Sequence, residues 1–599
     1  MKIKVRVEEI IIGAILGAAT GYALTAPLLV LVGAPLASLS PLALVRTEPV
    51  SLIRSAGILV SCAGIAGMLA GAWFASRQES EQHLRGVRYI PDGEVAHETL
   101  QASERGRMSR AQRNGKVHGV MIGGVELARA REVGHALLIA LPDSGKSVLL
   151  RLVLDQALAR GDKVIVHDPK GEFVEAYFDP SQVVLLGPWD SRAAIWSTAD
   201  IDSPTLVDEF AAALCGVADS GQNRSFHTGA AAVLGGLIKG LMRNADGWTW
   251  AQLGEALNEE PDVMIKRAAE ADPAVRQAIL SMFAAKQKDL SPGESAMVSI
   301  LATSSRMLRQ LAAVDRGRPD ASRFSMRRWL LGVDCQHARL VVLNSNAEYP
   351  QAAEALFGAI LSVISATVVS RMPDASADGT GVWLIMDEAP QLGASGLAKV
   401  QTIAEIGRSR GIRVWQAAQS EAQFSAKMGS EQAAPLLATQ NLRIYLRTGP
   451  ADADSIARRY GDREIQRLES TASQGAIAGK VARYERVPVL MPSDLSGLRV
   501  RSEGPEFLFA SGDLVGRLIQ PFPSRRPPVA PAYLECPSWC AGLLPPTVQE
   551  PVAEHEVQSY GRRPGQHESH REHLCSAGAS VGHDTPDSPV SPNGLDWEG

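Results

Sequence analysis

Four consecutive residues, Ser144, Gly145, Lys146 and Ser147, lie between an apolar run and a helical segment of the sequence. In a loop of this kind, backbone N–H groups and the amino end of the following helix point at one place where phosphate oxygens can bind. The Lys146 ammonium would reach the outer phosphates of a nucleotide, and the Ser147 hydroxyl would ligate Mg²⁺. The full pattern G-x-x-x-x-G-K-[ST] is not met, because Ala140 occupies its first glycine position and Asp143 adds a carboxylate to the loop.

A second candidate site is the acidic pair Asp387 and Glu388, which ends an apolar run that starts at Trp383. Two carboxylates at the carboxyl end of a buried strand are what nucleotide hydrolysis requires opposite a phosphate loop. Asp387 would hold the Mg²⁺ shell, and Glu388 would orient and deprotonate the attacking water. A strand that ends in solvated acids is the alternative. The two sites together favour a Mg²⁺-dependent P-loop NTPase.

Two further side chains flank the apolar run from Ile412 to Ala418. Gln419 follows the run and could sense the γ-phosphate or the attacking water. Arg408 precedes the run and could project to the nucleotide of a neighbouring subunit as an arginine finger, a group that stabilises transition-state charge. A simple surface charge is the alternative for Arg408.

The chain from His135 onward alternates between short apolar runs and helical segments, which indicates parallel strands joined by crossover helices. The runs are nearly continuous in apolar residues, as expected for strands buried on both faces. They cover residues 135–140, 164–168, 183–187, 339–344, 383–388, 412–418 and 442–447. The sequence therefore predicts an α/β fold with a mostly parallel sheet. Because the carboxyl ends of parallel strands share one edge, the phosphate loop and the acidic pair should meet there.

The remaining segments indicate how this α/β domain is divided. Residues 203–327 show helical spacing and no convincing strand, which predicts an all-α domain inserted between two halves of the nucleotide-binding domain, 135–202 and 328–520. The second half ends in a predicted hairpin, with strands at 506–510 and 514–519. Residues 77–134 are expected to form a juxtamembrane linker and the start of the motor domain. Residues 521–599 lack periodicity and are expected to be a disordered tail.

Two uncharged apolar stretches near the amino terminus, Ile10 to Val32 and Ala56 to Ala75, are each long enough to cross a bilayer as a helix. They predict a transmembrane anchor within residues 1–76. Basic residues precede the first stretch and follow the second, which places both ends on the cytoplasmic side. A cleaved signal peptide is the alternative for the first stretch, but Glu8 and Glu9 and its length argue against cleavage.

The composition limits the partners. The 599 residues carry a formal charge of -5, so a basic protein that simply coats nucleic acid is excluded. Aromatic residues make up 5%, too few to suggest stacking platforms for bases. Any DNA contact should therefore be made to phosphates and be independent of sequence. Six scattered cysteines do not form a disulfide framework and are consistent with a reducing cytoplasm.

Five motifs occur in the order found in the TraG/TraD-type coupling proteins of type IV secretion and conjugation systems. They are the phosphate loop and residues 168–172, 387–393, 407–414 and 419–424. Residues 324–330 and the helical insertion resemble the TrwB-like branch of that family. The resemblance covers about residues 1–520. By position, Lys146 and Ser147 match the family's phosphate loop, Asp387 and Glu388 its acidic pair, and Gln419 its following glutamine.

The resemblance implies a RecA-like motor domain that assembles as a homohexamer on the cytoplasmic face of the bacterial inner membrane. Such a protein recruits relaxase bound to DNA to a type IV secretion channel, and ATP hydrolysis drives transfer of the single strand. A receptor or scaffold with weak or no ATPase activity is the alternative suggested by Ala140 and Asp143. Export of protein effectors is another. A chromosome-segregation motor would carry a winged-helix reader after the motor, and the sequence shows only a polar tail there.

Overall fold

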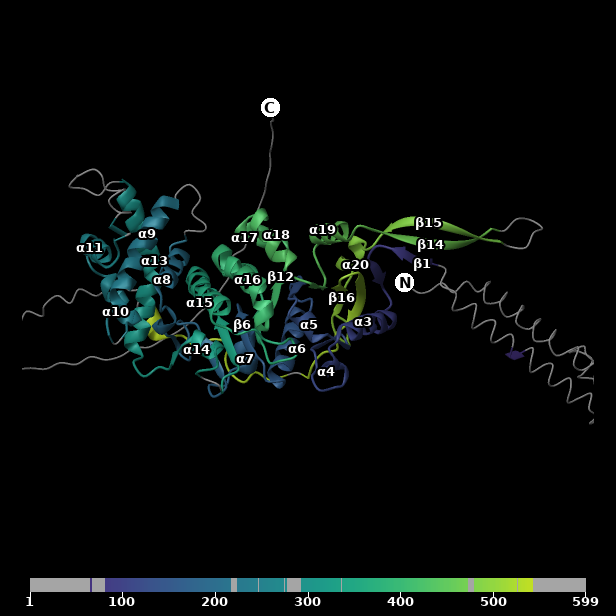
Figure 1. Ribbon diagram of the computed structural model, residues 1–599, viewed down its shortest axis with the longest axis horizontal. Coiled ribbons are helices and arrows are strands. Elements are labelled where there is room, and N and C mark those ends of the chain that lie inside the picture. The colour runs from purple at the N-terminus through teal and green to yellow at the C-terminus, as the bar shows by residue number, and fades with distance from the viewer. Residues whose placement is uncertain are drawn as a thin grey trace, which may run out of the picture. The chain divides into compact units, whose positions relative to one another are not determined.

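The computed structural model describes residues 65–66, 81–216, 224–245, 247–273, 275–276, 292–334, 337–471, 479–524 and 526–541 (Figure 1). Apart from Ile65 and Ala66, the two predicted membrane spans lie outside these residues. Within the described residues, helix α15 (Pro350–Ser370) is long and apolar enough to cross a membrane, yet 72% of its apolar window is buried inside the protein. It is placed as a core helix.

Ten strands form the main sheet, in the order β2-β17-β16-β13-β5-β12-β11-β6-β10-β7. The last seven run parallel, and β16 and β17 form the predicted antiparallel hairpin at the other side. The strands are β2 (Arg88–Ile90), β5 (Ala136–Ile139), β6 (Lys163–Asp168), β7 (Val183–Leu186), β10 (Leu340–Asn344), β11 (Val382–Met386), β12 (Ile412–Ala418), β13 (Leu442–Tyr445), β16 (Glu506–Ser511) and β17 (Leu514–Ile519). The prediction of a mostly parallel α/β sheet is confirmed.

Helices cover both faces of this sheet. Val166 and Ile385 point into the apolar cluster beneath α6 (Lys146–Ala159) and α7 (Glu172–Tyr177). Ile165 and Leu384, one residue earlier on the same strands, point into the cluster beneath α15 and α16 (Gly393–Gly407). Both faces are apolar, which is why the strands read as continuous apolar runs.

The described residues between Pro204 and Gly317 form helices and no strand. They are α8 (Pro204–Leu214), α9 (Arg224–Leu241), α10 (Trp250–Ala256), α11 (Pro261–Ala271) and α13 (Pro292–Gly317). Ser203 caps α8, and Thr249 begins α10 with a capping box. The indole of Trp250 packs between Trp196 and Phe210, with ring centres 5.6 and 6.0 Å away. The apolar core of these helices is continuous with the cluster beneath α15 and α16.

Residues 77–134 are expected from the sequence to form a juxtamembrane linker and the start of the motor domain, and from Glu81 onward they are folded, so the linker part of that expectation is corrected. Strand β2 joins the main sheet, and helix α3 (Gly93–Arg107) packs on β17. Only Ala96, Leu100 and Glu104 of α3 are buried, so a polar composition concealed a narrow apolar stripe. A Cβ added at Gly516 of β17 would lie 2.6 Å from Leu100 Cδ1, which shows how closely the helix approaches the strand.

A second sheet was not predicted at all. It consists of β1 (Glu81–Arg85), β14 (Asp462–Thr471) and β15 (Gly479–Pro488) in antiparallel order β1-β14-β15 (Figure 1). These strands carry charged residues at many positions, so they lack the apolar runs that identified the main sheet. The shorter elements are β3 (Met121–Ile122), β4 (Val125–Glu126), α4 (Arg110–Arg113), α5 (Arg129–Glu132), β8 (Ile195–Trp196), β9 (Arg323–Phe324), α14 (Met326–Leu330), α17 (Ala422–Met428), α18 (Ser430–Ala438), α19 (Pro450–Tyr460), α20 (Pro492–Ser496) and α21 (Pro537–Ala541).

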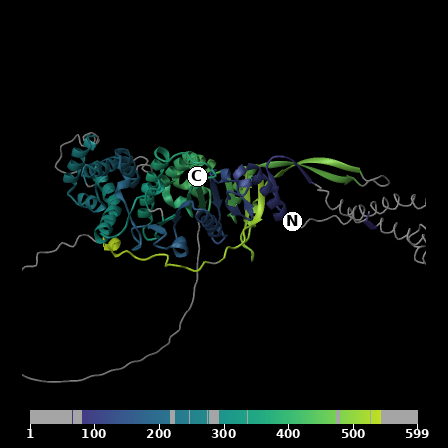
Figure 2. The same ribbon diagram turned by 60° about the horizontal axis from the view of Figure 1, so that its bottom comes forward.

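The expectation of disorder from residue 521 is wrong for the part that reaches Ala541. This segment, hereafter the strap, leaves the end of β17 and crosses to the inserted helices (Figure 2). The Val529 N–H donates to the Glu175 carbonyl on α7 at 2.7 Å, and the Leu534 carbonyl accepts from Ser191. Trp539 is fully buried in α21, which packs against α13. The strap is therefore held by a few backbone hydrogen bonds and by the Trp539 indole, although its sequence shows no periodic pattern of apolar residues.

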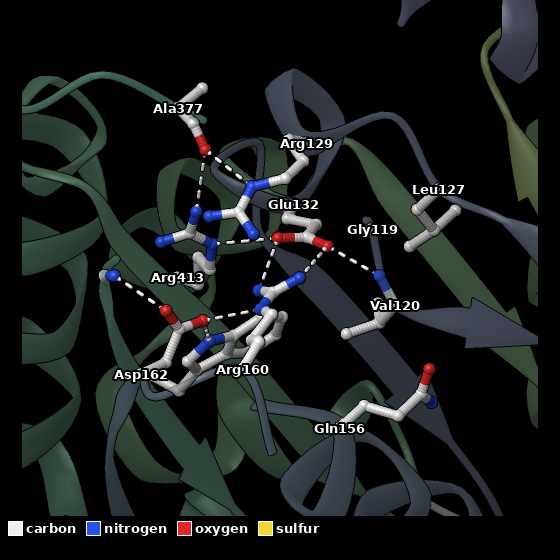
Figure 3. A network of polar contacts seen from close by, with 12 residues as sticks. Gly119, Val120, Leu127, Arg129, Glu132, Gln156, Arg160, Asp162, Ala377 and Arg413 are labelled. Atoms are coloured by element: carbon white, nitrogen blue, oxygen red, sulfur yellow. Dashed lines mark hydrogen bonds and ion pairs between the residues drawn. The ribbon is translucent and has the colours of Figure 1, made fainter. Parts of the chain in front are cut away.

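A buried polar network joins α5, the end of α6 and the amino ends of β6, β11 and β12 (Figure 3). The Glu132 carboxylate accepts from Arg413 Nε at 3.0 Å and from two nitrogens of Arg160 at 2.8 and 2.9 Å. Asp162 accepts from Arg160 at 2.8 Å and from the Trp383 indole at 2.8 Å. Arg129 donates to backbone carbonyls, including that of Ala377 at 2.9 Å. Both buried carboxylates at the amino edge of the sheet are therefore paired with guanidinium groups, and the third guanidinium, that of Arg129, is held by backbone carbonyls.

We expect Glu132→Gln to lower the free energy of unfolding by about 3 to 5 kcal/mol, because it leaves the buried Arg413 and Arg160 guanidinium groups without their shared counter-charge. Chemical denaturation of the detergent-solubilised chain measures this loss. Glu255→Gln is the control, since the Glu255 side chain is 68% exposed and lies 4.0 Å from Arg316. That exposed pair should contribute about 0 to 1 kcal/mol. Equal losses in the two variants would contradict a special role for the network.

Candidate functional site

The loop before α6 has the backbone conformation that a phosphate loop needs. Gly145 adopts φ 97° and Asp143 φ 58°, both left-handed. A Cβ on Gly145 would lie 2.5 Å from Pro505 Cβ, so only glycine fits there. Asp143 is exposed, so its carboxylate points away from the packed interior of the loop. Aspartate is one of the few non-glycine residues that adopt this conformation readily.

Ala140 stands where the motif has its first glycine, and its geometry explains why glycine is not needed. Its N–H donates to the Ala418 carbonyl at 3.0 Å, so the residue prolongs the pairing of β5 with β12. The backbone φ angle of Ala140 is not positive, so the position does not require glycine. Ser144 is buried, and its hydroxyl donates to the Leu141 carbonyl, which closes the loop on itself. Neither departure from the motif distorts the loop.

Lys146 and the acidic pair meet at one point. The Lys146 Nζ lies 3.0 Å from Glu388 Oε2 and 3.4 Å from Asp387 Oδ1, and it donates to the Asp387 carbonyl at 3.1 Å. Strands β5 and β11 are parallel and separated by β12 alone, so their carboxyl ends open at the same edge. Gln419 follows β12 and places Nε2 3.4 Å from Glu388 Oε2. The structure thus gathers four of the expected site residues at one edge.

The Asp387 carboxyl is hard to ionise. Burial raises its pKa to about 6, the Lys146 ammonium opposes that shift, and the charges of Glu172 and Asp168 add to it. Glu388 Oε1 is buried and accepts no hydrogen bond from the described residues, whereas Asp387 Oδ1 has the Lys146 ammonium 3.4 Å away. Buried acceptors without donors are rare in folded proteins and need a reason. Mg²⁺ prefers oxygen ligands, so the carboxylates and the hydroxyl of Ser147, the residue after Lys146 on α6, are donor types that suit it.

Two acidic residues near this edge were not singled out from the sequence, although they belong to the motif at 168–172. Asp168 ends β6, and its carboxylate accepts from the N–H groups of Phe173 and Val174 at 2.8 and 3.0 Å, which caps α7. Glu172 lies 3.4 Å from Arg151 of α6. Their position in the sequence could have identified them. The motif follows a predicted strand whose carboxyl end had to lie at the same edge of the sheet as Asp387.

A cavity of about 700 Å³ opens beside Glu388 and Gln419. Its other walls come from the carboxyl ends of β6 and β10 and from α15 and α17. The polar lining includes Ser345, Asn346 and Lys427. The cavity gives water and a second ligand access to Glu388 from the side away from the phosphate loop.

Arg408 is not part of this cluster. It lies in a short turn directly before β12, whereas Gln419 directly follows the same strand. The two residues therefore stand at opposite edges of the sheet. Arg408 is exposed, and its neighbour Arg410 pairs with Asp374 at 3.1 Å. Its assignment as an arginine finger stays a prediction, and any such role would be toward another chain.

A phosphate loop, an acidic pair and a following glutamine at the open edge of a parallel sheet define a nucleotide-binding protein of the P-loop NTPase type. Residues 119–504 match the DNA-binding domain of type IV secretion-system coupling proteins. The chain belongs to this family of coupling proteins.

A relative of known function is the coupling protein TraD of Escherichia coli K12, which is 24% identical over 411 residues. The match covers 68% of this chain and 53% of TraD, so the chain spans about half the length of that relative. Among solved structures, the bacterial conjugative coupling protein TrwBdeltaN70 in an unbound form superposes with a TM-score of 0.60 at 20% identity, covering 76% of this chain and 96% of that one.

Plasmid coupling protein TrwB has also been solved in complex with the ATP analogue ADPNP and with ADP and Mg²⁺. These structures superpose with TM-scores of 0.59 and 0.58 at 20% identity, and each match covers 76% of this chain and 98% of the other. At this identity the likeness establishes the fold, which agrees with the P-loop NTPase arrangement described above.

We expect Mg²⁺-dependent nucleotide binding to weaken below about pH 6, by up to about tenfold per pH unit, because protonated Asp387 cannot ligate the ion. Isothermal titration with ADPNP and Mg²⁺ between pH 5 and pH 8 measures the affinity. Asp387→Asn should bind weakly throughout and lose this added pH dependence. The nucleotide's own phosphate titration is common to both proteins. Parallel pH profiles for the two would contradict the assignment.

Proposed function

We propose that this chain is an inner-membrane coupling ATPase that recruits a relaxase–DNA substrate to a type IV secretion channel and drives transfer of single-stranded DNA by ATP hydrolysis. The observation that carries the proposal is the convergence of Lys146, Asp387, Glu388 and Gln419 at one sheet edge. Family membership supports the coupling role. The nucleotide complexes of TrwB support ATP and Mg²⁺ as the ligands.

The site residues divide the work of hydrolysis. Lys146, now held by the acidic pair, would turn to the β- and γ-phosphates when a nucleotide enters the loop. Asp387 and Ser147 would hold Mg²⁺, which neutralises developing charge on the phosphate oxygens. Glu388 Oε1 accepts no hydrogen bond from the part of the chain that the structure describes, so it would accept a proton from a water that approaches through the adjacent cavity. Gln419, beside Glu388, would orient that water.

Hydrolysis would then proceed as a displacement at the γ-phosphorus. The water oxygen bonds to the γ-phosphorus, the bond from that phosphorus to the bridging oxygen of ADP breaks, and Glu388 takes the proton. The release of Lys146 from Glu388 is part of the proposal, because a carboxylate paired with an ammonium is a poorer base. Nucleotide binding would therefore both seat the phosphates and activate the base.

The remaining parts of the proposal concern partners. DNA contact would be made to phosphates without sequence preference, in keeping with the matched DNA-binding domain. The assembly would be a homohexamer, anchored by the two predicted spans, with Arg408 reaching the nucleotide of the next subunit. The competing proposal is a scaffold with a decayed site. The exposure of Asp143 and the regular strand pairing of Ala140 support an active site over that alternative. Protein effectors remain the alternative cargo.

We expect Glu388→Gln to reduce steady-state ATP hydrolysis at least about 100-fold while nucleotide binding persists, because only proton removal is lost. Full-length chain in nanodiscs, with and without single-stranded DNA, is the sample. Lys146→Ala should lose hydrolysis and tight binding together. Wild-type turnover no higher than that of Lys146→Ala in both conditions would favour the scaffold.

We expect Arg408→Ala and Glu388→Gln chains, each inactive alone, to regain hydrolysis when mixed. A site with an intact Glu388 would receive the finger of a neighbour with an intact Arg408. Random pairing at equal amounts predicts about a quarter of wild-type activity, since each such contact needs one chain of each kind in a fixed order. Arg410→Ala is the control and should keep its activity alone. Absence of recovery in co-assembled rings would contradict the role of Arg408.

A further inference from the structure

The three-stranded sheet of β1, β14 and β15 takes no part in the nucleotide site, yet it exposes large side chains. Tyr484 is 71% exposed, and the side chains of Arg85 and Arg486 are 84% and 76% exposed. Leu84, at an irregularity of β1, is also exposed. A tyrosine and arginines on an open sheet face are the residue types that gather where protein meets the lipid headgroup layer.

The strand register places these side chains on one face. Arg85, Glu464 and Arg486 form a row across the three strands, and Gln82, Gln466 and Tyr484 form another row two positions along. In the first row the Glu464 carboxylate lies 3.9 Å from Arg85 and 3.1 Å from Arg486. One carboxylate between two guanidinium groups leaves the row with a net positive charge. This face, defined by the two rows, is hereafter the basic face.

The length of chain before β1 sets where the basic face can be. The second predicted span ends at Ala75, and β1 begins at Glu81. Six residue steps reach about 20 Å at full extension. The hairpin also continues for four residue pairs beyond Arg467, the partner of Glu81, in the direction from which the chain enters β1. The hairpin therefore extends past the amino end of β1, the end that is covalently joined to the predicted span.

We propose that the basic face lies on the cytoplasmic leaflet and binds the phosphodiester groups of anionic lipids. Arg85 and Arg486 would each contact a lipid phosphate, and the Tyr484 ring would lie at the boundary between headgroups and acyl chains. This inference rests on the membrane anchor of the proposed function. The occupant is a bilayer because the short tether holds the face near it in every copy, whether or not copies assemble.

Lipid contact also fits the strength of each charge. A basic side chain is attracted weakly to an anionic surface, and the attraction acts within about a Debye length, roughly 8 Å. Two arginines on a tethered sheet would orient the domain on the membrane without anchoring it alone. The contact should then depend on anionic lipid and weaken with salt.

The test uses full-length chain in nanodiscs of phosphatidylcholine with one fifth phosphatidylglycerol, carrying the photo-crosslinker p-benzoylphenylalanine in place of Tyr484. Mass spectrometry after irradiation measures lipid adducts. We expect at least fivefold more adduct than with the crosslinker in place of Val263, which is 53% exposed on α11. We also expect a loss of at least fivefold in the double variant Arg85→Glu and Arg486→Glu, with ATP hydrolysis unchanged.

Two results would overturn the inference. One is adduct formation at Tyr484 with a second copy of the chain rather than with lipid. The other is a lipid yield equal to that at Val263, or unaffected by the arginine variants and by pure phosphatidylcholine. Resistance to alkaline extraction and ATP turnover, measured on the same sample, separate this failure from failure of the proposed function. An anchored, active chain without Tyr484 adducts refutes only the basic face, whereas an extractable chain refutes both.

Discussion

The ion contact between Lys146 and the two carboxylates that follow β11 is the interaction on which the rest of the site depends. Two buried acids meet one ammonium, so the cluster carries an uncompensated negative charge. Burial shifts Asp387 toward its neutral form, and Glu388 Oε1 accepts no hydrogen bond from the described residues. A site in this condition favours a divalent cation, and a cation that arrives with phosphates also provides new partners for Lys146.

The charged side chains at the two edges of the main sheet differ in how fully they are paired. At the amino edge, the Glu132 and Asp162 carboxylates accept hydrogen bonds from guanidinium groups, which ties α5 and the end of α6 to the strands. At the carboxyl edge, Glu388 Oε1 accepts no hydrogen bond from the described residues. The amino edge is held together by its own side chains, whereas the carboxyl edge keeps an acceptor that a ligand can use. Helix α6 spans both, because it begins at Lys146 and ends beside Arg160.

The main sheet and the convergence of Lys146 with Asp387 could be predicted because strands buried on both faces are continuous apolar runs, and parallel strands share their carboxyl edge. The location of Arg408 away from its own site also follows from sequence position, since it precedes the strand that Gln419 follows. Three features of the structure were not predicted from the sequence. The β14 and β15 strands alternate charges, α3 buries three residues only, and the strap depends on one tryptophan and scattered backbone bonds. None of these leaves a periodic signal, because long-range pairing rather than local pattern stabilises them.

The strap changes how the inserted helices are joined to the nucleotide domain. An insertion normally hangs on two covalent crossings, but here a third connection runs from β17 past α7 to α13, and it is fastened by the Trp539 indole against Trp189 and Tyr349. With two covalent connections the inserted helices could rotate as a hinged unit against the nucleotide domain, and the third connection opposes that rotation. Any swing of the inserted helices relative to the nucleotide domain must therefore either move α7 as well or separate the Trp539 indole from Trp189 and Tyr349.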